Sequence, residues 1–110
     1  MYSDSKIKTM KDITKIYLGH ITCDKRTQFT EIEVSAFIDL ALSKFKIEGA
    51  TLYDATGYWK GDVEPSTVIE IVYDDPATII SINDAALFLK RFLHQESVLV
   101  VTQEANVNFL

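Results

Sequence analysis

Cysteine, proline and glycine are scarce in this 110-residue sequence, which contains one cysteine, two prolines and four glycines. Cys23 has no partner for an internal disulfide, which excludes a disulfide-stapled secreted domain and makes the reducing cytoplasm the expected compartment. Because Cys23 ends a segment that is predicted to be a strand, we expect it to be a small buried apolar side chain rather than a nucleophile.

Long apolar runs are also missing. No run approaches the roughly 18 residues that a membrane span requires, so we expect no membrane partner. The start of the chain, Met1–Asp12, is polar and lacks the apolar core of a signal peptide. We expect residues 1–12 to form a flexible N-terminal arm.

Clustered positive charge is the third absence. The formal net charge is −5 at pH 7, the pI is near 4.9, and the lysines and arginines are scattered along the chain. A surface that binds phosphates needs clustered Lys and Arg side chains, so we expect no nucleic-acid partner.

What the sequence does contain is the composition of an ordinary globular domain, with 47% hydrophobic and 25% charged residues. A chain of this length can bury a core without cross-links, but it is too short for two domains. We therefore expect a single domain over residues 13–110.

The first half of this domain predicts a strand and then a helix. Ile13–Cys23 is rich in β-branched and aromatic residues, as strands are. Thr30 and Glu33 match a capping box, in which each side chain accepts a hydrogen bond from the other residue's backbone N–H. An apolar stripe at helical spacing follows, made of Val34, Phe37, Ile38, Ala41, Leu42 and Phe45.

Two further strands are predicted over residues 49–59 and 66–75, joined by a turn over residues 60–65. Pro76 cannot donate a hydrogen bond to a strand ladder, so it marks the end of the second of these strands.

The last two predicted elements are a helix over residues 81–95, capped by Ser81 or Asn83, and a strand over residues 96–103. The apolar side of the helix comprises Ile82, Ala85, Ala86, Leu89 and Leu93. The order βαββαβ predicts an α+β, ferredoxin-like fold with a four-stranded antiparallel sheet and two helices on one face.

The predicted strands are apolar on both sides. In the last predicted strand, Val98 and Val100 lie on one side, and Leu99 and Val101 lie on the other. In the third strand, Val68 and Val72 lie on one side, and Ile69 and Ile71 lie on the other. Two helices can cover only one face of a sheet, and the other face would be a large exposed apolar patch. We therefore infer a homo-oligomer in which the helix-free faces pack together.

Glu70 interrupts this apolar pattern, on the same side of its strand as Val68 and Val72. An unpaired buried charge is energetically expensive. Glu70 is therefore either an edge residue that reaches solvent or a neighbouring lysine, or it is a functional carboxylate.

Tyr58 and Trp59 lie between Gly57 and Gly61. They are either hydrophobic plugs at the end of a hairpin or part of a binding site. In the second interpretation the glycines allow a ligand to approach closely, and the rings supply faces for stacking or for a cation.

Motifs of metal and nucleophilic chemistry are missing. His20 and His94 are isolated, with no second ligand at metal-binding spacing, so we expect no metal site. There is also no phosphate-binding glycine loop, no nucleophile elbow and no Cys/His pair.

Three features together resemble the S-adenosylmethionine (SAM)-degrading enzymes of bacteriophages, the SAM lyases that were formerly called SAM hydrolases. They are the segment DATGYWKGDVEPSTVIEI at residues 54–71, the segment INDAALFLKRFLHQESVLVVTQ at residues 82–103, and the element order. The resemblance extends over about Ile13–Leu110. Its most specific parts are the Asp-x-Thr-Gly-x-aromatic-basic segment Asp54–Lys60 and the predicted helix that runs directly into SVLVV at residues 97–101.

This resemblance implies a PII-like ferredoxin fold and a trimer with active sites between the subunits. It also implies cleavage of SAM to methylthioadenosine and L-homoserine lactone, without a metal or a cofactor. Phages use this activity to deplete the methyl donor in the host cytoplasm and so to blunt restriction-modification.

On the same resemblance, Glu70 would hold the α-ammonium of the substrate and Tyr58 would orient the substrate through its hydroxyl. Trp59 or Tyr53 would face the sulfonium or the adenine. Glu104, expected just past the last strand, would be a contact from the neighbouring subunit.

Three alternatives stay open. One is a SAM hydrolase that makes homoserine, with Glu70 as the general base for water. Another is a non-catalytic PII-like or CutA-like trimer that binds a small nucleotide. The third is a phage protein that binds a host partner through its acidic surface.

Overall fold

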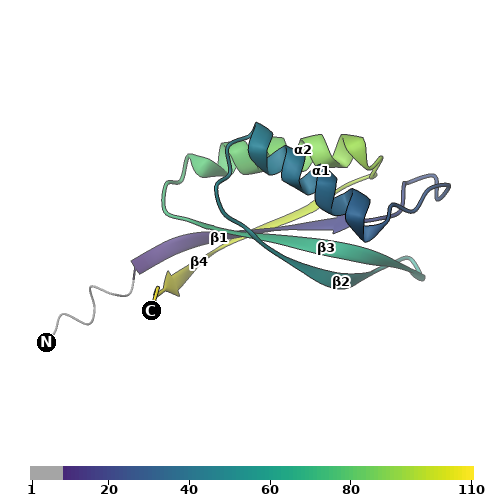
Figure 1. Cartoon of the computed structure of the whole chain (residues 1–110). Helices are drawn as coiled ribbons and strands as arrows, with labels where there is room; N and C mark the ends of the chain where they lie inside the picture. Colours follow the sequence, from purple (N-terminus) through teal and green to yellow (C-terminus); the bar gives the residue numbers. More distant parts are fainter. Residues whose placement is uncertain (1–8) are drawn as a thin grey trace, which may run out of the picture.

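The computed structural model describes residues 9–110 and has the predicted order βαββαβ. The elements are β1 (Thr9–Gly19), α1 (Glu31–Lys44), β2 (Thr51–Trp59), β3 (Asp62–Tyr73), α2 (Thr78–Phe92) and β4 (Leu99–Val107). The strands form one antiparallel sheet in the order β2-β3-β1-β4. Both helices lie on the same face of this sheet (Figure 1). The ferredoxin-like prediction is confirmed.

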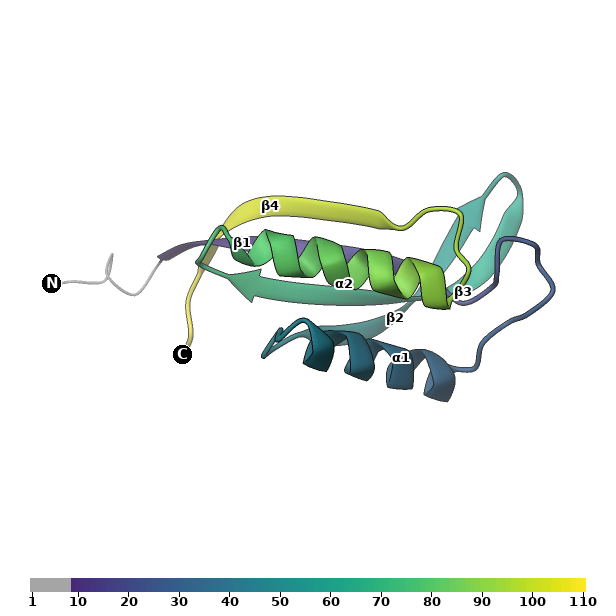
Figure 2. The same cartoon turned by 90° about the horizontal axis from the view of Figure 1, so that it is seen from above.

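The core lies between the two helices and the face of the sheet that they cover. Figure 2 shows α2 above the central strands and α1 towards the β2 side. The buried side chains that form this core come from β1, β3 and both helices, and they include Ile16, Leu18, Val34, Ile38, Ile69, Ile71, Ile82 and Leu89. The apolar side predicted for α2 is buried throughout, because all five of its residues are at most 5% exposed.

Strand β1 begins earlier and ends earlier than predicted. Its pairing with β4 starts at Thr9, opposite Val107, so the flexible arm predicted over residues 1–12 is wrong for residues 9–12. Residues 1–8 lie outside the described residues. Since β1 ends at Gly19, Cys23 falls in the following turn and is exposed, and the prediction that it is buried is wrong.

The β2–β3 connection is shorter than the predicted turn over residues 60–65. Only Lys60 and Gly61 connect the strands, with φ angles of 50° and 83°. Two consecutive positive φ angles are typical of the tight hairpin turns that match the twist of the flanking strands. Residues 62–65 therefore pair with β2, and the two strands form a long hairpin that projects beyond the helices (Figure 1).

The helices begin in different ways. The capping box of α1 is confirmed, since Thr30 and Glu33 exchange both hydrogen bonds. Helix α2 begins at Thr78, so the caps predicted at Ser81 or Asn83 are wrong and both residues lie inside the helix. The N-cap residue is Ala77, and its backbone N–H donates to the carboxylate of Asp75 at 3.0 Å.

Strand β4 begins three residues later than predicted and continues to Val107. The delay has a local cause, because His94 adopts a φ of 49° after α2 and Gln95 donates its N–H back to the carbonyl of Lys90. No helix in the described residues is long and apolar enough to span a membrane.

Candidate active site

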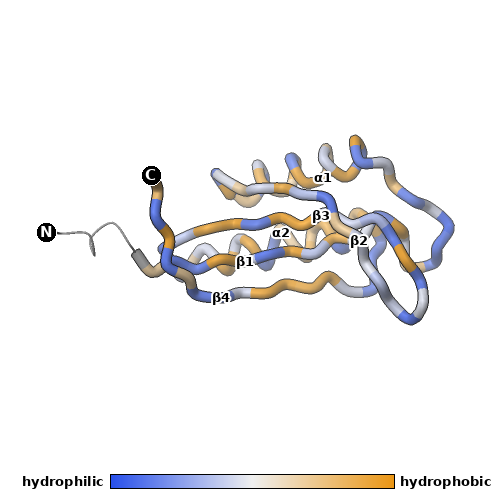
Figure 3. Tube along the Cα trace, turned by 90° about the horizontal axis from the view of Figure 1, so that it is seen from below, coloured by the Kyte–Doolittle hydropathy of each residue, from blue (hydrophilic) through white to orange (hydrophobic). Residues whose placement is uncertain are grey.

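The sheet has a second face that neither helix covers. Side chains alternate between the faces along each strand, and the register places one set together on this side. This helix-free face comprises Ile13, Lys15, Tyr17, Thr51, Tyr53, Val68, Glu70, Val72, Leu99 and Val101. Seen from below, apolar stretches of β1, β3 and β4 lie side by side with hydrophilic positions between them (Figure 3). The strands are therefore apolar on both sides, as predicted.

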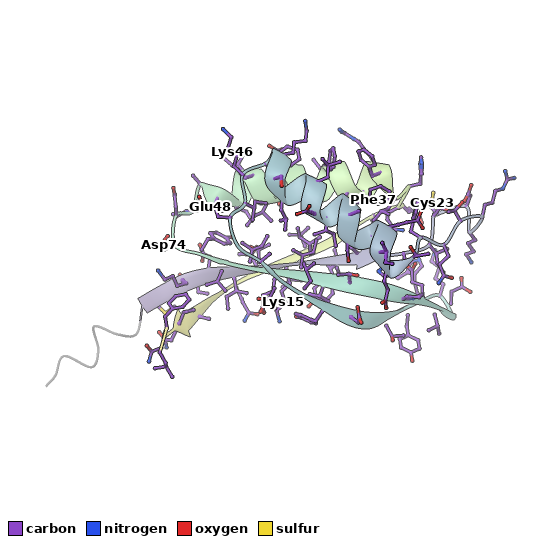
Figure 4. The ribbon with its side chains drawn as sticks, in the orientation of Figure 1. Lys15, Cys23, Phe37, Lys46, Glu48 and Asp74 are labelled. Atoms are coloured by element: carbon purple, nitrogen blue, oxygen red, sulfur yellow. The ribbon has the colours of Figure 1, made fainter. Side chains whose placement is uncertain are left out.

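An ion pair lies at the centre of the helix-free face. Lys15 of β1 is directly opposite Glu70 of β3, and the Nζ to Oε2 distance is 3.8 Å. This distance is longer than the 2.7–3.2 Å of a direct hydrogen bond. Each side chain is 29% exposed, and Figure 4 shows Lys15 on the side away from the helices. In the single chain, Glu70 therefore has the neighbouring lysine that one interpretation of the sequence required.

Two tyrosines lie next to this ion pair. Tyr17 and Tyr53 are the cross-strand partners of Val68, one on each side of it. Val68 is buried between them, whereas Tyr53 is 41% exposed. The site predicted from the sequence included Tyr53 and Glu70, and the fold brings these two into one neighbourhood. It did not include Lys15 or Tyr17, because only the strand register reveals them.

Tyr58 and Trp59 are far from Glu70 in the same chain. Thr51 is opposite Glu70, and Tyr58 lies seven residues further along β2, which corresponds to roughly 23 Å of extended strand. Tyr58 also pairs with Val63 and so belongs to the opposite face of the sheet. Both rings are largely exposed at the hairpin tip, where the Nζ of Lys60 lies 5.5 Å from the centroid of Trp59.

Glu104 is also separate from the ion pair. It lies inside β4, opposite Asp12, rather than just past the last strand. Alternation along β4 assigns it to the same face as Val100, the face that the helices cover. A site that combines Glu104, Tyr58 or Trp59 with Glu70 therefore needs more than one copy of the chain.

Glu64, at the base of the hairpin, was not predicted as a functional residue. Its Oε2 accepts a hydrogen bond from the backbone N–H of Ile21, at 3.1 Å. Its carboxylate lies so close to Gly19 that an added Cβ there would be 2.6 Å from Oε1. A Cβ on Gly57 would likewise lie 3.0 Å from the hydroxyl of Ser66. In the single chain, the space beside these glycines is occupied by the chain's own side chains.

His20 is a buried titratable group at the end of β1. It is 2% exposed, and its Nε2 lies 2.8 Å from the hydroxyl of Thr67. Burial lowers the pKa of His20, and the negative charges of Glu31, Asp54 and Glu64 partly oppose this shift. Within residues 9–110 no three His, Cys, Asp or Glu side chains are grouped as metal ligands.

Comparison with known families decides the assignment of the chain. Residues 13–109 match the model of a family described as proteins of unknown function, DUF3574. The chain belongs to the DUF3574 family. No curated protein matches the sequence of this DUF3574 member.

Solved structures share its fold at low sequence identity. A phage SAM lyase in complex with S-methyl-5'-thioadenosine is 20% identical, with 90% of each chain covered and a TM-score of 0.68. A phage SAM lyase in the apo state is 15% identical, with a TM-score of 0.67 over 99% of this chain and 96% of the other. CPII, a nitrogen regulatory PII-like protein from Thiomonas intermedia K12 bound to ADP, AMP and bicarbonate, is 12% identical, with a TM-score of 0.55 over 94% and 98% of the two chains. The DUF3574 chain therefore has a PII-like ferredoxin fold and resembles phage SAM lyases in structure.

The helix-free face of the DUF3574 chain combines opposite charges with aromatic rings. It presents one positive and one negative side chain within 4 Å, and both are partly withdrawn from water. Charges act more strongly on a ligand where the surroundings are apolar. The neighbouring aromatic rings offer faces that attract a cation.

Proposed function

We propose that this protein is a SAM lyase that cleaves SAM to methylthioadenosine and L-homoserine lactone, and so depletes the methyl donor. The observation that carries the proposal is the carboxylate of Glu70, which lies beside Lys15 and Tyr53 and between Val68 and Val72 on its strand face. The fold is shared with two phage SAM lyases over at least 90% of each chain, which supports placing this chemistry here.

The proposed reaction asks little of the side chains. One oxygen of the substrate's own carboxylate attacks the γ-carbon, the bond between that carbon and sulfur breaks, and its electron pair returns to sulfur. The products are a neutral thioether and a lactone, so the step consumes no water and needs no cofactor. The protein must fold the methionyl chain into attack geometry and keep water out. The carboxylate and sulfonium charges cancel in the transition state, so an apolar pocket favours the step.

In this proposal Glu70 holds the α-ammonium of the substrate and does not block its carboxylate, one oxygen of which attacks the γ-carbon. Tyr53 faces the sulfonium, since an aromatic ring attracts a cation over its face. Tyr58, Trp59 and Glu104 are proposed as contacts from a neighbouring subunit, because one chain cannot bring them to Glu70.

A homotrimer with its helix-free faces turned inward would supply those contacts. The faces carry exposed apolar side chains that association would bury, with Leu99 60%, Val72 40% and Val101 37% exposed. The long hairpin that carries Tyr58 and Trp59 extends beyond its own helices (Figure 1). We propose that this hairpin reaches the ion pair of the adjacent subunit.

A nucleotide-binding regulator is the second candidate function. CPII, which shares the fold, is described as bound to ADP, AMP and bicarbonate. The two-residue turn at Lys60 and Gly61 argues against this alternative, since PII-type proteins carry a long mobile loop at that connection.

Incubation of the purified protein with SAM, followed by mass spectrometry, tests the proposed function. The lyase predicts methylthioadenosine and homoserine lactone in equal amounts, in the absence of metal or nucleotide. Intact SAM after prolonged incubation would contradict it. Retention of ADP or AMP together with intact SAM would support the regulator instead.

A further inference from the structure

We infer that Lys15 is a positioning residue that binds the α-carboxylate of the substrate, so that Lys15 and Glu70 together recognise the amino-acid end of SAM. This inference rests on the proposed function. Lys15 would be a further specificity determinant, and it lies on β1, a strand that the sequence pattern did not connect with the site.

The first argument is chemical complementarity. The methionyl end of SAM carries an ammonium and a carboxylate on one carbon, and the helix-free face carries a carboxylate and an ammonium opposite each other. Each group of the protein can therefore take the opposite charge of the ligand. Charge-assisted hydrogen bonds of this type are roughly twice as strong as neutral ones.

The second argument is that the two side chains are available. At 3.8 Å the ion pair is not a hydrogen bond, and within residues 9–110 neither Lys15 nor Glu70 makes another side-chain hydrogen bond. Their N–H donors and oxygen acceptors are therefore free to bind a ligand that enters between them. Lys11, on the same strand and the same face, is by contrast engaged with Asp74 at 3.1 Å.

The third argument is rigidity. Strand β1 is hydrogen-bonded to β3 on one side and β4 on the other, so Lys15 lies between Glu70 and Val101. A residue whose backbone is fixed on both sides loses no further backbone entropy when it binds a ligand, so only the entropy of its side chain is lost. This placement holds the two charges in register without a loop.

The reaction itself predicts what Lys15 contributes. The substrate carboxylate is charged, whereas the lactone product has no carboxylate, so the contact with Lys15 exists before the reaction and is lost during it. An interaction that weakens on the way to the transition state lowers KM and cannot raise kcat, and its removal raises KM and leaves kcat unchanged or higher. Lys15 therefore favours binding of the intact amino acid and release of the lactone.

The test compares wild type with Lys15→Met, Lys15→Arg and the matched control Lys11→Met, which makes the same change on the same strand. Calorimetry measures the binding of SAM and of decarboxylated SAM in the slowly reacting Tyr58→Phe background, in which SAM survives the titration. Decarboxylated SAM lacks the nucleophile and cannot react, and mass spectrometry measures turnover of SAM by the variants with Tyr58 intact. Size-exclusion chromatography checks that each variant keeps the wild-type oligomer.

In this background we expect the protein with Lys15 intact, with or without Lys11→Met, to bind SAM at least about tenfold more tightly than decarboxylated SAM, as one charge-assisted hydrogen bond permits. Lys15→Met should lose this preference and raise KM about tenfold, with kcat unchanged or raised by less than about threefold. Lys15→Arg should keep most of the preference, because it keeps the charge.

Three outcomes would overturn the inference, and a fourth would separate it from the proposed function. If wild type degrades SAM and Lys15→Met keeps the preference for the carboxylate, Lys15 does not read it and the proposed function still stands. A collapse of kcat at unchanged KM would assign Lys15 to the chemical step instead. If wild type leaves SAM intact but binds it in a Lys15-dependent way, the proposed lyase activity fails while the recognition of the amino acid holds. If wild type binds neither compound, both are overturned.

Discussion

Glu70 and Tyr58 are the residues whose separation shapes the account of the site. They lie on opposite faces of the sheet in one chain, about seven residues apart along the β2–β3 ladder. If both act on one substrate, they must come from different subunits. A site built from two subunits predicts that two inactive variants can complement each other, which a single-chain site does not predict.

Glu70→Gln and Tyr58→Phe should each keep the oligomer and lose SAM turnover by roughly 100-fold, because a misplaced substrate costs about that much. Trimers that mix the two variants should regain part of the activity, since some of their sites combine an intact Glu70 with an intact Tyr58 from the neighbour. Mass spectrometry of the products after co-expression measures this.

The unmixed variants, purified in the same way, are the control for this complementation. If mixed trimers are no more active than the separate variants, the proposal that Glu70 and Tyr58 of neighbouring subunits form one site is wrong. Wild-type rates in both separate variants would remove the residues from the mechanism.

His20 makes the stability of the fold depend on pH. Its pKa is lowered in the folded chain, chiefly by burial, so the unfolded chain binds the proton more tightly. The free energy of unfolding should be constant above pH 7 and should fall as the pH drops through the unfolded pKa of 6.5 towards the lower folded value. Urea denaturation between pH 7.5 and 5.5 measures this, above the range in which most carboxylates titrate.

His20→Gln is the control, because it keeps a hydrogen-bonding group near Thr67 but cannot titrate. Its free energy of unfolding should change less over the same pH interval. An identical slope in wild type and His20→Gln would show that another group causes the dependence.

At the scale of elements, the base of the hairpin is fastened to the end of β1. Glu64 packs over Gly19 and accepts the N–H of Ile21, and Lys25 in the following loop forms an ion pair with Asp62. These contacts hold the first residues of β3 against the segment that leaves β1. They help to fix the orientation of the projecting hairpin relative to the rest of the domain.

Gly19→Ala should therefore destabilise the fold by about 0.5–1.5 kcal/mol, since the new methyl group must displace the flexible end of Glu64 and with it the hydrogen bond from Ile21. Chemical denaturation measures the loss. The double variant Gly19→Ala with Glu64→Ala should lose less than the sum of the single changes, because the two sites are in contact. Additive losses would mean that Glu64 moves away without cost.

The elements that sequence predicts well are those determined locally. The capping box of Thr30 and Glu33 and the apolar side of α2 depend on neighbours within four residues, and the structure confirms both. Strand ends depend on distant partners. The start of β1 at Thr9 depends on pairing with Val107, and no local pattern reveals it.

The site shows the same division. Glu70 stands out in the sequence as a carboxylate among valines, but its partner Lys15 lies on another strand and appears only once the register is known. A two-residue turn at Lys60 and Gly61 determines which residues of the hairpin pair. With the turn placed there, the face of the sheet on which Tyr58 lies could have been predicted from the sequence.

As a whole molecule, the single chain is less compact than its length allows. The Cα radius of gyration is 15.7 Å, against about 13 Å expected for a compact domain of this size. The projecting hairpin and the extended ends of β1 and β4 account for this shape (Figure 1). Together with the exposed apolar helix-free face, it favours an assembly.

Leu99→Lys should break the proposed trimer into monomers, because it puts a charge on the helix-free face where Leu99 is 60% exposed. Light scattering coupled to size-exclusion chromatography measures the mass. Ile32→Lys is the matched control, since Ile32 is 83% exposed on α1, on the other side of the molecule.

The control should keep the wild-type mass, and only Leu99→Lys should also lose SAM turnover. A wild-type protein that is itself a monomer at micromolar concentration would contradict the assembly directly. Loss of the oligomer in Ile32→Lys alone would place the interface on the helices.

The measurement that tests the lyase most directly is turnover of SAM in water enriched in oxygen-18, with mass spectrometry of the products. Attack by the substrate's own carboxylate predicts lactone without the label, and any homoserine formed when the lactone opens should carry the label in its carboxyl group. Homoserine labelled in its γ-hydroxyl would show that water attacked the γ-carbon, and would contradict the lyase in favour of a hydrolase.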